Sequence, residues 1–434
     1  MQGQSIASPA TAAISQQVRL PRSTPYFAAF VLVLLARIYI PASLLDEMFS
    51  YDRSGGTIFE KFHPGAIAIA LLFALMLATV GWLPRVREPK IIRSSILLVG
   101  GCILTGAVQV YYGRTSGLAY LADSVIVGPL VAAMMLTLTN RERINVGLFI
   151  LAALVVNDMI LFIEFATSTR LLPYAEPEPF FRPTALLNHP LANGLVNATA
   201  VVYVLTLPLP ARMRLFLMLM FVGACFASGA RFATIASVLG AVIAIWTMLH
   251  ERSRRLKISA KLVVIVFVQI AVVLGVLVYI LLALGLAKRM LLLGFHDSST
   301  ESRFTAFYIL ELFPVRDLMI GADPRSLATV MNVGLGIQTI ENPVVAMITQ
   351  FGIIGCAIIL PLLTYFLLTL ARCNNRLILL AVVVFVITGS TNNTFAAKGP
   401  TIALIAALAM SARRSGSAAE IAAAPRYSAL IGKT

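Results

Sequence analysis

Residues 343–371 read PVVAMITQFGIIGCAIILPLLTYFLLTLA, an uninterrupted run without a charged side chain. A helix needs about 20 apolar residues to cross the hydrocarbon core of a bilayer, so this stretch predicts a transmembrane helix. Similar runs recur along the chain, separated by polar breaks. Together they predict about 12 spans, at 26–45, 64–83, 91–110, 118–138, 144–166, 190–208, 212–228, 230–249, 261–287, 343–371, 376–391 and 395–412.

The composition indicates the same fold class. Of the 434 residues, 59% are hydrophobic and 12% are charged, whereas a soluble domain carries about 25% charged residues. A soluble core of this length could not bury so much apolar surface, but a bilayer can. We therefore predict an all-α polytopic membrane protein.

The net charge of +15 does not indicate a nucleic-acid partner. The basic residues lie in short breaks between apolar runs, where they set the topology and contact anionic membrane lipids. The four cysteines show no CxxC or metal spacing, and the four histidines are far apart without an HExxH pattern. We expect no disulfide framework, no metal and no other cofactor.

Lys and Arg also orient the spans. Residues 1–25 form a polar tail, and the apolar run that follows is too long for a signal-peptide core. With this tail in the cytoplasm, the short basic breaks all lie inside, as the positive-inside rule requires. The predicted organisation is nine helices over 26–287, a large periplasmic loop over 288–342, three helices over 343–412 and a cytoplasmic tail over 413–434, in a bacterial inner membrane. The loop is rich in apolar side chains, so we expect short amphipathic helices in it.

Polar side chains within the predicted spans fall in their outer halves. Such groups are costly in a bilayer and often mark a functional site. Their bias to one side predicts a hydrated cavity that is open to the periplasm and closed to the cytoplasm. The alternative is that they pair and hold the helices together, with Arg37 and Asp158 as one candidate pair. The residues concerned are Arg37, Asp123, Asn157, Asp158, Glu164, Asn193, Asn197 and Arg231.

Three short outer stretches carry residues suited to a reaction: SGAR at 228–231, ESRF at 301–304 and IEN at 340–342. Arginine presents a planar, permanently charged fork that matches phosphate oxygens. Arg231 and Arg303 could therefore hold a diphosphate at the outer interface, and Glu341 could accept a proton from an incoming hydroxyl. This combination suits group transfer from a lipid-linked diphosphate and needs no metal.

In their order and topology, these stretches resemble the superfamily of Wzy-type polysaccharide polymerases and O-antigen ligases, multi-span proteins with a fold like that of the GT-C glycosyltransferases. The resemblance covers roughly residues 185–395 and includes NHPLANG at 188–194. It implies a periplasmic, inverting glycosyltransferase whose donor is an undecaprenyl-diphosphate-linked glycan and whose acceptor is a lipid-linked repeat unit. A chain-length regulator and a flippase are the implied protein partners.

The same resemblance assigns roles to individual residues. Arg231, Arg303 and Glu341 would be catalytic. The sequence departs from the family pattern at Leu191, where the pattern has asparagine, and at Glu341, where the ligase branch has histidine. The second departure favours a polymerase of the exopolysaccharide, capsule or O-antigen type. The expected substrate contacts are His189, Asn193, Arg325, Asn342, Asp158 and Arg37.

Each assignment has a structural alternative. Arg231 could anchor its helix at the membrane interface, and Arg303 could pair with a neighbouring carboxylate of the loop. Glu341 could be the acidic charge that suits the N-terminus of the helix beginning at 343, with Asn342 as its cap. Two other functions stay open: a ligase with the same site, and a twelve-span transporter or lipid-linked glycan flippase, which must expose polar surface to both faces in turn.

Overall fold

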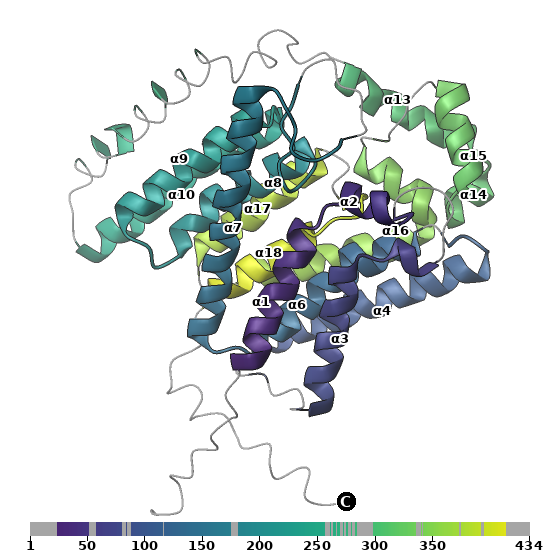
Figure 1. Ribbon diagram of the computed structural model, residues 1–434, viewed down its shortest axis with the longest axis horizontal. Helices are drawn as coiled ribbons and strands as arrows, with labels where there is room; N and C mark the ends of the chain where they lie inside the picture. Colours follow the sequence, from purple (N-terminus) through teal and green to yellow (C-terminus); the bar gives the residue numbers. More distant parts are fainter. Residues whose placement is uncertain are drawn as a thin grey trace, which may run out of the picture.

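The computed structural model describes residues 24–51, 58–79, 84, 88–115, 117–174, 181–256, 298–335, 340, 342–372, 375–391 and 395–413, with scattered positions between 261 and 283. Within these ranges every regular element is a helix (Figure 1). In chain order the helices are α1 (Thr24–Tyr39), α2 (Ala42–Met48), η2 (Ile58–Lys61), α3 (Pro64–Thr79), α4 (Pro89–Tyr111), α5 (Leu118–Tyr120), η3 (Leu121–Ile126), α6 (Val127–Thr137), α7 (Asn140–Thr167), α8 (Pro190–Tyr203), η4 (Val204–Thr206), α9 (Ala211–Ala227), α10 (Arg231–Leu256), α13 (Ser298–Leu312), α14 (Val315–Ile320), α15 (Pro324–Thr329), η5 (Val330–Leu335), α16 (Pro343–Ala371), α17 (Arg376–Ser390) and α18 (Thr401–Ser411).

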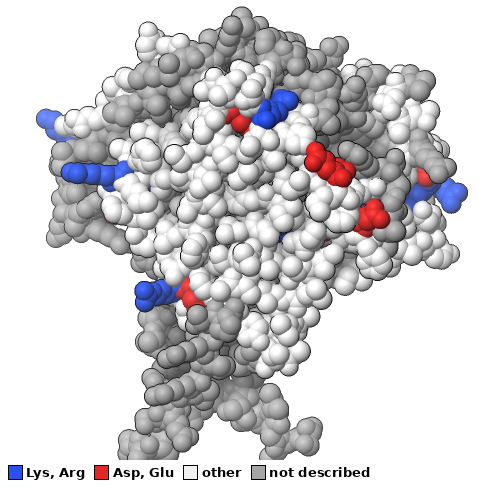
Figure 2. Space-filling model, in the orientation of Figure 1, with Lys and Arg blue, Asp and Glu red and all other residues white. Residues whose placement is uncertain are grey.

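Several of these helices are long and apolar enough to cross a membrane. Among the described residues five qualify by length and composition, and α1 with α2 would make a sixth if the bent pair were one span. The side chains of Leu32, Leu71 and Ile96 are 70%, 65% and 65% exposed, which suits contact with lipid better than contact with water. Figure 2 shows scattered charged residues on one face, separated by wide uncharged areas. These are the features of a helical membrane protein.

Described helices cover eleven of the twelve predicted spans, and the run at 261–287 lies mostly outside the described residues. The short helices expected in the loop over 288–342 are present as α13, α14, α15 and η5. The first predicted span is shorter than expected. It ends at Tyr39, and α2 departs at an angle of 84°. Pro41 lies at this bend, and proline disfavours helical backbone at the residue before it.

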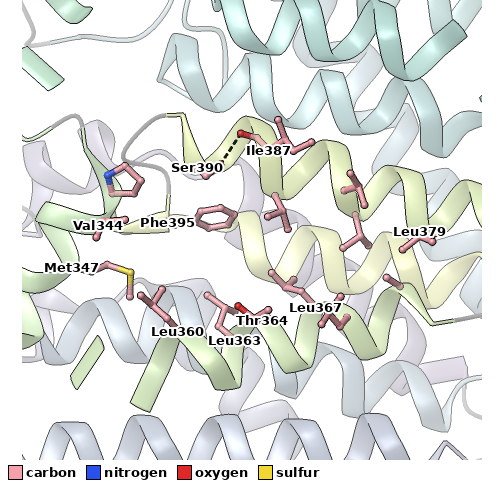
Figure 3. Close-up of a pocket in the computed structure, with 16 residues that line it drawn as sticks. Val344, Met347, Leu360, Leu363, Thr364, Leu367, Leu379, Ile387, Ser390 and Phe395 are labelled. Carbon is pink, nitrogen blue, oxygen red and sulfur yellow. Dashed lines mark hydrogen bonds between the residues drawn. The ribbon is translucent and has the colours of Figure 1, made fainter. Parts of the chain in front are cut away.

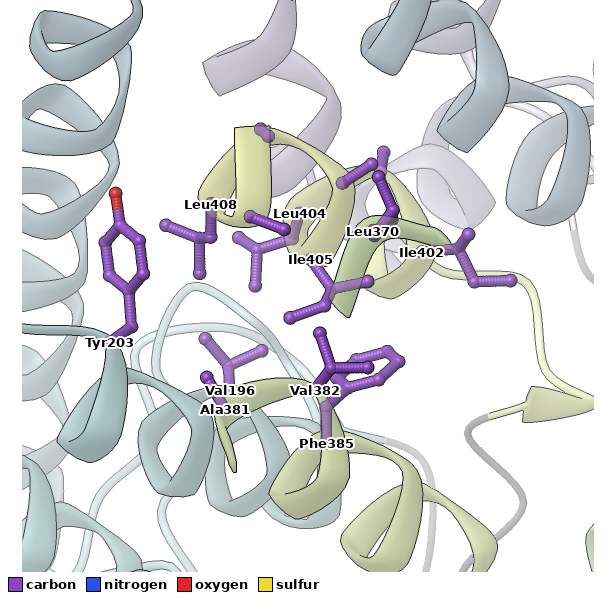
Figure 4. Close-up of a cluster of buried hydrophobic side chains, with 14 of the residues drawn as sticks. Val196, Tyr203, Leu370, Ala381, Val382, Phe385, Ile402, Leu404, Ile405 and Leu408 are labelled. Carbon is purple, nitrogen blue, oxygen red and sulfur yellow. The ribbon is translucent and has the colours of Figure 1, made fainter. Parts of the chain in front are cut away.

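The predicted span at 395–412 is instead a short core helix. α18 has 11 residues, all of them buried, and a helix this short does not cross the hydrocarbon core by itself. Gly128 of α6 and Gly147 of α7 let these two helices pack closely against it, at Ile402 and Ser411. Figure 4 shows Ile405 and Leu408 of α18 directed toward Val196 and Tyr203 of α8, with Phe385 of α17 nearby. α18 therefore forms the centre around which the longer helices are arranged.

Local signals explain where the helices begin. Thr139 and Glu142 form a capping box at α7: the Glu142 N–H donates to Thr139 Oγ1 at 3.2 Å, and the Thr139 N–H donates to the Glu142 carboxylate at 2.8 Å. At α16, Asn342 Oδ1 accepts two N–H groups of the first turn at 3.0 and 3.2 Å. The cap role that the sequence predicts for Asn342 is therefore confirmed.

α16 is broken in its N-terminal half. Gly352 leaves helical geometry, with φ 70° and ψ 173°, and the C-terminal end of α14 lies against the break. The side-chain amide of Gln109 on α4 donates to the carbonyls of Ile320 at 2.6 Å and Phe351 at 3.3 Å. Irregular backbone at membrane depth is tolerated only where its polar groups find such partners. The break thus becomes the docking point for α14.

Candidate functional site

The stretches NHPLANG and SGAR lie against each other. Gly229 has a φ of 66° in the turn between α9 and α10, and this turn packs on Gly194 of α8. A Cβ atom on Gly194 would lie 2.5 Å from the Ala230 Cβ and 2.9 Å from the Ala233 Cβ, so glycine is required for the close approach. Arg231 is the first residue of α10 and is half-buried. Two motifs predicted to share a site are therefore neighbours in the fold.

The other two predicted motifs also lie on adjoining elements. Ala306 and Ile309 of α13 are fully buried against Val345 in the first turn of α16. Position 303 is one helical turn before Ala306, and position 341 directly precedes the Asn342 cap. The backbone thus brings the two stretches together. For two predicted residues, Arg303 and Arg325, the structure describes the backbone but not the side chain. Glu341 lies outside the described residues altogether.

α17 connects these two pairs of motifs. It packs against α10, which begins with Arg231, and against α16, which begins just after the IEN stretch. An apolar pocket of about 340 Å³ lies between α16 and α17 and extends from Val344 to Ala371 along α16. Figure 3 shows side chains from both helices around it, including Met347 and Leu363. Such a lining suits a hydrocarbon chain, so this pocket is not the hydrated cavity that the sequence predicts.

The predicted pair of Arg37 and Asp158 is not formed. Asp158 is fully buried on α7, and its Oδ1 accepts the amide groups of Asn157 at 3.2 Å and Asn197 at 2.9 Å. The Arg37 Nη2 donates instead to the main-chain carbonyl of Asp123 at 2.9 Å. α1 thus directs its arginine toward η3, whereas Asp158 faces α8. Sequence spacing could not show this, because it depends on how α1 and α7 are rotated about their axes.

Other buried polar groups on α7 and α8 hold the loop at 181–189 in place. The Glu164 carboxylate accepts three N–H groups of the segment between α7 and α8, at 2.7, 2.7 and 2.9 Å. Asn193 is fully buried, donates to the carbonyl of Thr184 at 2.6 Å, and accepts the Asn157 amide at 2.8 Å. His189 Nδ1 accepts an N–H of the first turn of α8 at 3.2 Å. The Asn193 amide is thus engaged within the fold, and its role as a substrate contact stays a prediction.

A second polar cluster surrounds Asp123 in the π-helical turn η3. The Asp123 Oδ2 accepts the Tyr51 hydroxyl at 2.9 Å and the His63 N–H at 2.8 Å. Lys398 donates to the Tyr51 carbonyl at 2.7 Å, and its Nζ lies 4.3 Å from the centroid of the Tyr51 ring. Turns of this type often occur at functional sites. Sequence reasoning named Arg37 and Asp123 but missed the other three, although a lysine within a predicted span was a usable signal.

His63 lies in the loop before α3 and is neutral near pH 7. Burial, together with the nearby Arg37 charge, lowers the pKa of its ring from 6.5 to about 4. Its Nδ1 accepts the Gly65 N–H at 2.9 Å, so Nε2 carries the hydrogen and donates to the Ile40 carbonyl at 3.0 Å. The ring therefore acts as a neutral bridge between the end of α1 and the start of α3.

No family model, curated protein or solved structure matches this chain. Within the described ranges, no group of three or more His, Cys, Asp or Glu side chains could hold a metal ion. The function is therefore inferred from the chain's own residues and from the elements that carry them.

Proposed function

We propose that this protein is an inner-membrane glycosyltransferase that polymerises lipid-linked polysaccharide repeat units. In this proposal the chain forms a GT-C-like bundle of transmembrane helices, with its active face in the periplasm. The donor is a growing glycan on undecaprenyl diphosphate, and a single lipid-linked repeat unit supplies the acceptor hydroxyl.

The proposed reaction is a single displacement at the anomeric carbon of the donor. Glu341 takes the proton of the acceptor hydroxyl, and the acceptor oxygen forms a bond to the anomeric carbon with inversion. The bond from that carbon to the diphosphate oxygen breaks, and the electron pair leaves with the lipid diphosphate. Arg231 and Arg303 neutralise the charge that develops on this leaving group. Asn342 caps α16 and so fixes the segment that carries Glu341.

The observation that carries the proposal is the packing of α13 on the first turns of α16. Ala306, Ile309 and Val345 form one buried cluster, so α13, which carries position 303, adjoins α16, which begins two residues after position 341. α17 packs on both α16 and α10, and α10 begins with Arg231. The apolar pocket between α16 and α17 begins at the same end of α16 and would accommodate hydrocarbon of the lipid substrate.

Replacing Arg303 with alanine tests the mechanism. We expect polymer synthesis to fall by about 10²-fold or more, the usual effect of removing a group that stabilises transition-state charge. An R303K variant, which retains the charge without the planar fork, should lie between R303A and the wild type. The matched control is R316A, which removes an exposed arginine from the neighbouring helix α14. Membrane insertion is confirmed for each variant, and full-length polymer from R303A would overturn the mechanism.

The lipid-linked glycans of a deletion strain separate polymerase from its rivals. Single repeat units that accumulate on the periplasmic side indicate a polymerase. Polymer that accumulates on the lipid carrier would indicate a ligase, and units retained on the cytoplasmic side would indicate a flippase.

A flippase is the second candidate, favoured by the break in α16 at Gly352, because discontinuous helices form the substrate sites of many transporters. A single cysteine at Ser390, an exposed residue that lines the pocket between α16 and α17, in a background without the native cysteines, distinguishes the two. A flippase should allow labelling from both faces of the membrane, whereas the polymerase should allow labelling from the periplasm alone.

A further inference from the structure

The least compensated charge among the described residues is Asp158, in the middle of the helix bundle. It has no exposed surface. Its Oδ1 accepts two amide groups, from Asn157 and Asn197. Its Oδ2 is buried and accepts no hydrogen bond. One oxygen of this carboxylate thus accepts hydrogen bonds from neutral donors, and the other oxygen accepts none.

A second buried oxygen without a partner lies beside it. The Asn197 amide nitrogen donates to Asp158 Oδ1 at 2.9 Å, and the oxygen of the same amide, Asn197 Oδ1, has no hydrogen-bond donor. The Tyr39 hydroxyl of α1 is also buried without a partner, and it lies close enough for the Asp158 charge to act on it. Two acceptor oxygens of hydrogen-bonded side chains, Asp158 Oδ2 and Asn197 Oδ1, are therefore both buried without a donor.

The charges around Asp158 do not neutralise it. The titratable groups on the elements packed against it are Tyr39 on α1 and Cys225 on α9, both neutral, while α8 contributes the amides of Asn193 and Asn197. No described lysine, arginine or histidine acts on it, because Arg37 is engaged with Asp123. Glu164 lies further along α7 and is itself acidic. An ionised carboxylate in such surroundings is strongly disfavoured unless a cation accompanies it.

We propose that Asp158 and Asn197 form a buried site for a monovalent cation, a proton or a sodium ion, between α7 and α8. One carboxylate balances one positive charge, and the amide oxygen and the Tyr39 hydroxyl are neutral oxygen ligands. A divalent ion would retain an uncompensated charge here, because such ions are usually held by several carboxylates. Cation binding stabilises the polar contact between α7 and α8, independently of any glycosyl transfer.

The melting temperature of the full-length protein in detergent measures this coupling. It is recorded in sodium chloride and in choline chloride of equal ionic strength, between pH 6.5 and 9, where His63 stays neutral. A sodium site raises the melting temperature saturably with sodium concentration at fixed pH. A proton site raises it as the pH falls, in either salt. In both cases we expect a shift of about 3 °C or more.

Asp158→Asn removes the charge with little change in volume and should abolish the dependence. Glu164→Gln is the matched control. Glu164 is also a buried carboxylate on α7, but three backbone N–H groups already hold it. We expect E164Q to retain the cation or pH dependence of the wild type.

Asn197→Ala keeps the carboxylate and removes the second oxygen, so it tests the site even if D158N does not fold. It should weaken the apparent sodium affinity by about tenfold, or move the pH midpoint by about one unit. Wild-type melting that depends on neither sodium nor pH would overturn the proposal. An unchanged dependence in D158N or in N197A would overturn it as well.

Discussion

Replacing Gly352 with alanine should detach α14 from the break in α16. Gly352 has φ 70° and ψ 173°, a backbone region that only glycine occupies readily. An added Cβ would lie 2.5 Å from the backbone nitrogen of Ile320, and closer still to the carbonyl of Met319. These are main-chain atoms, so no side-chain rotation can relieve the collision.

The expected loss of stability follows from these two effects. Holding a non-glycine residue in this conformation costs about 1–3 kcal/mol. Adding a methyl group to a packed contact costs typically about 1–3 kcal/mol. Together they give about 2–6 kcal/mol. Movement of α14 would also weaken the hydrogen bond from the Ala322 N–H to the Thr349 carbonyl, which is 2.8 Å long.

Thermal unfolding of the purified protein in detergent measures the effect. The matched control is Gly100→Ala in the middle of α4, where an added Cβ meets no atom within 4 Å. Alanine favours the helix over glycine by about 1 kcal/mol, so this control should be as stable as the wild type or slightly more stable. If G352A has the same melting temperature as the wild type, α16 does not require a glycine at the break, and the contact with α14 does not depend on it.

Three further predictions concern groups that the structure places in buried polar contacts. Gln109→Leu leaves the Ile320 and Phe351 carbonyls without their donor, so it should lower the free energy of unfolding, measured with denaturant, by about 1–3 kcal/mol. Equal stability would contradict the role of Gln109 at the break. Lys398→Met retains the side-chain stem but removes a charge-assisted hydrogen bond to the Tyr51 carbonyl. It should therefore lower the free energy of unfolding in the same measurement by about 1.5–3 kcal/mol. An unchanged free energy would show that the Asp123 cluster does not need this charge. For His63, the folded pKa of about 4 lies below the ordinary 6.5, so the unfolded chain binds the proton first as the pH falls. Stability should therefore decrease between pH 6.5 and about 4, by about 3 kcal/mol, and a pH titration of the melting temperature with His63→Gln as control would show whether this ring is responsible.

The sequence predicted the fold class because membrane insertion depends on properties that are additive along the chain. The length of each apolar run and the absence of charge within it fix where a helix can cross the bilayer. The start of α16 was likewise readable, since a polar cap followed by proline acts locally. The short helices at 298–335 followed from the apolar content of that loop.

Placement of the polar residues could not be read in this way. Arg37 and Asp158 were both correctly identified as charges within spans, yet they face different neighbours. A hydropathy profile records depth in the membrane but not the rotation of a helix about its axis. The cluster of Tyr51, His63 and Lys398 around Asp123 joins segments that are far apart in the chain, and no local spacing indicates it.

The sequence by itself determined that this protein is a membrane-embedded helical bundle and where most of its helices begin. Only the tertiary structure decided that α18 is a buried core helix, that α16 breaks at Gly352, and that Asp158 faces Asn197 without a countercharge. The physical reason is that partitioning into a bilayer depends on each segment separately. Packing depends on which faces of several segments meet, and that information is not local to any one of them.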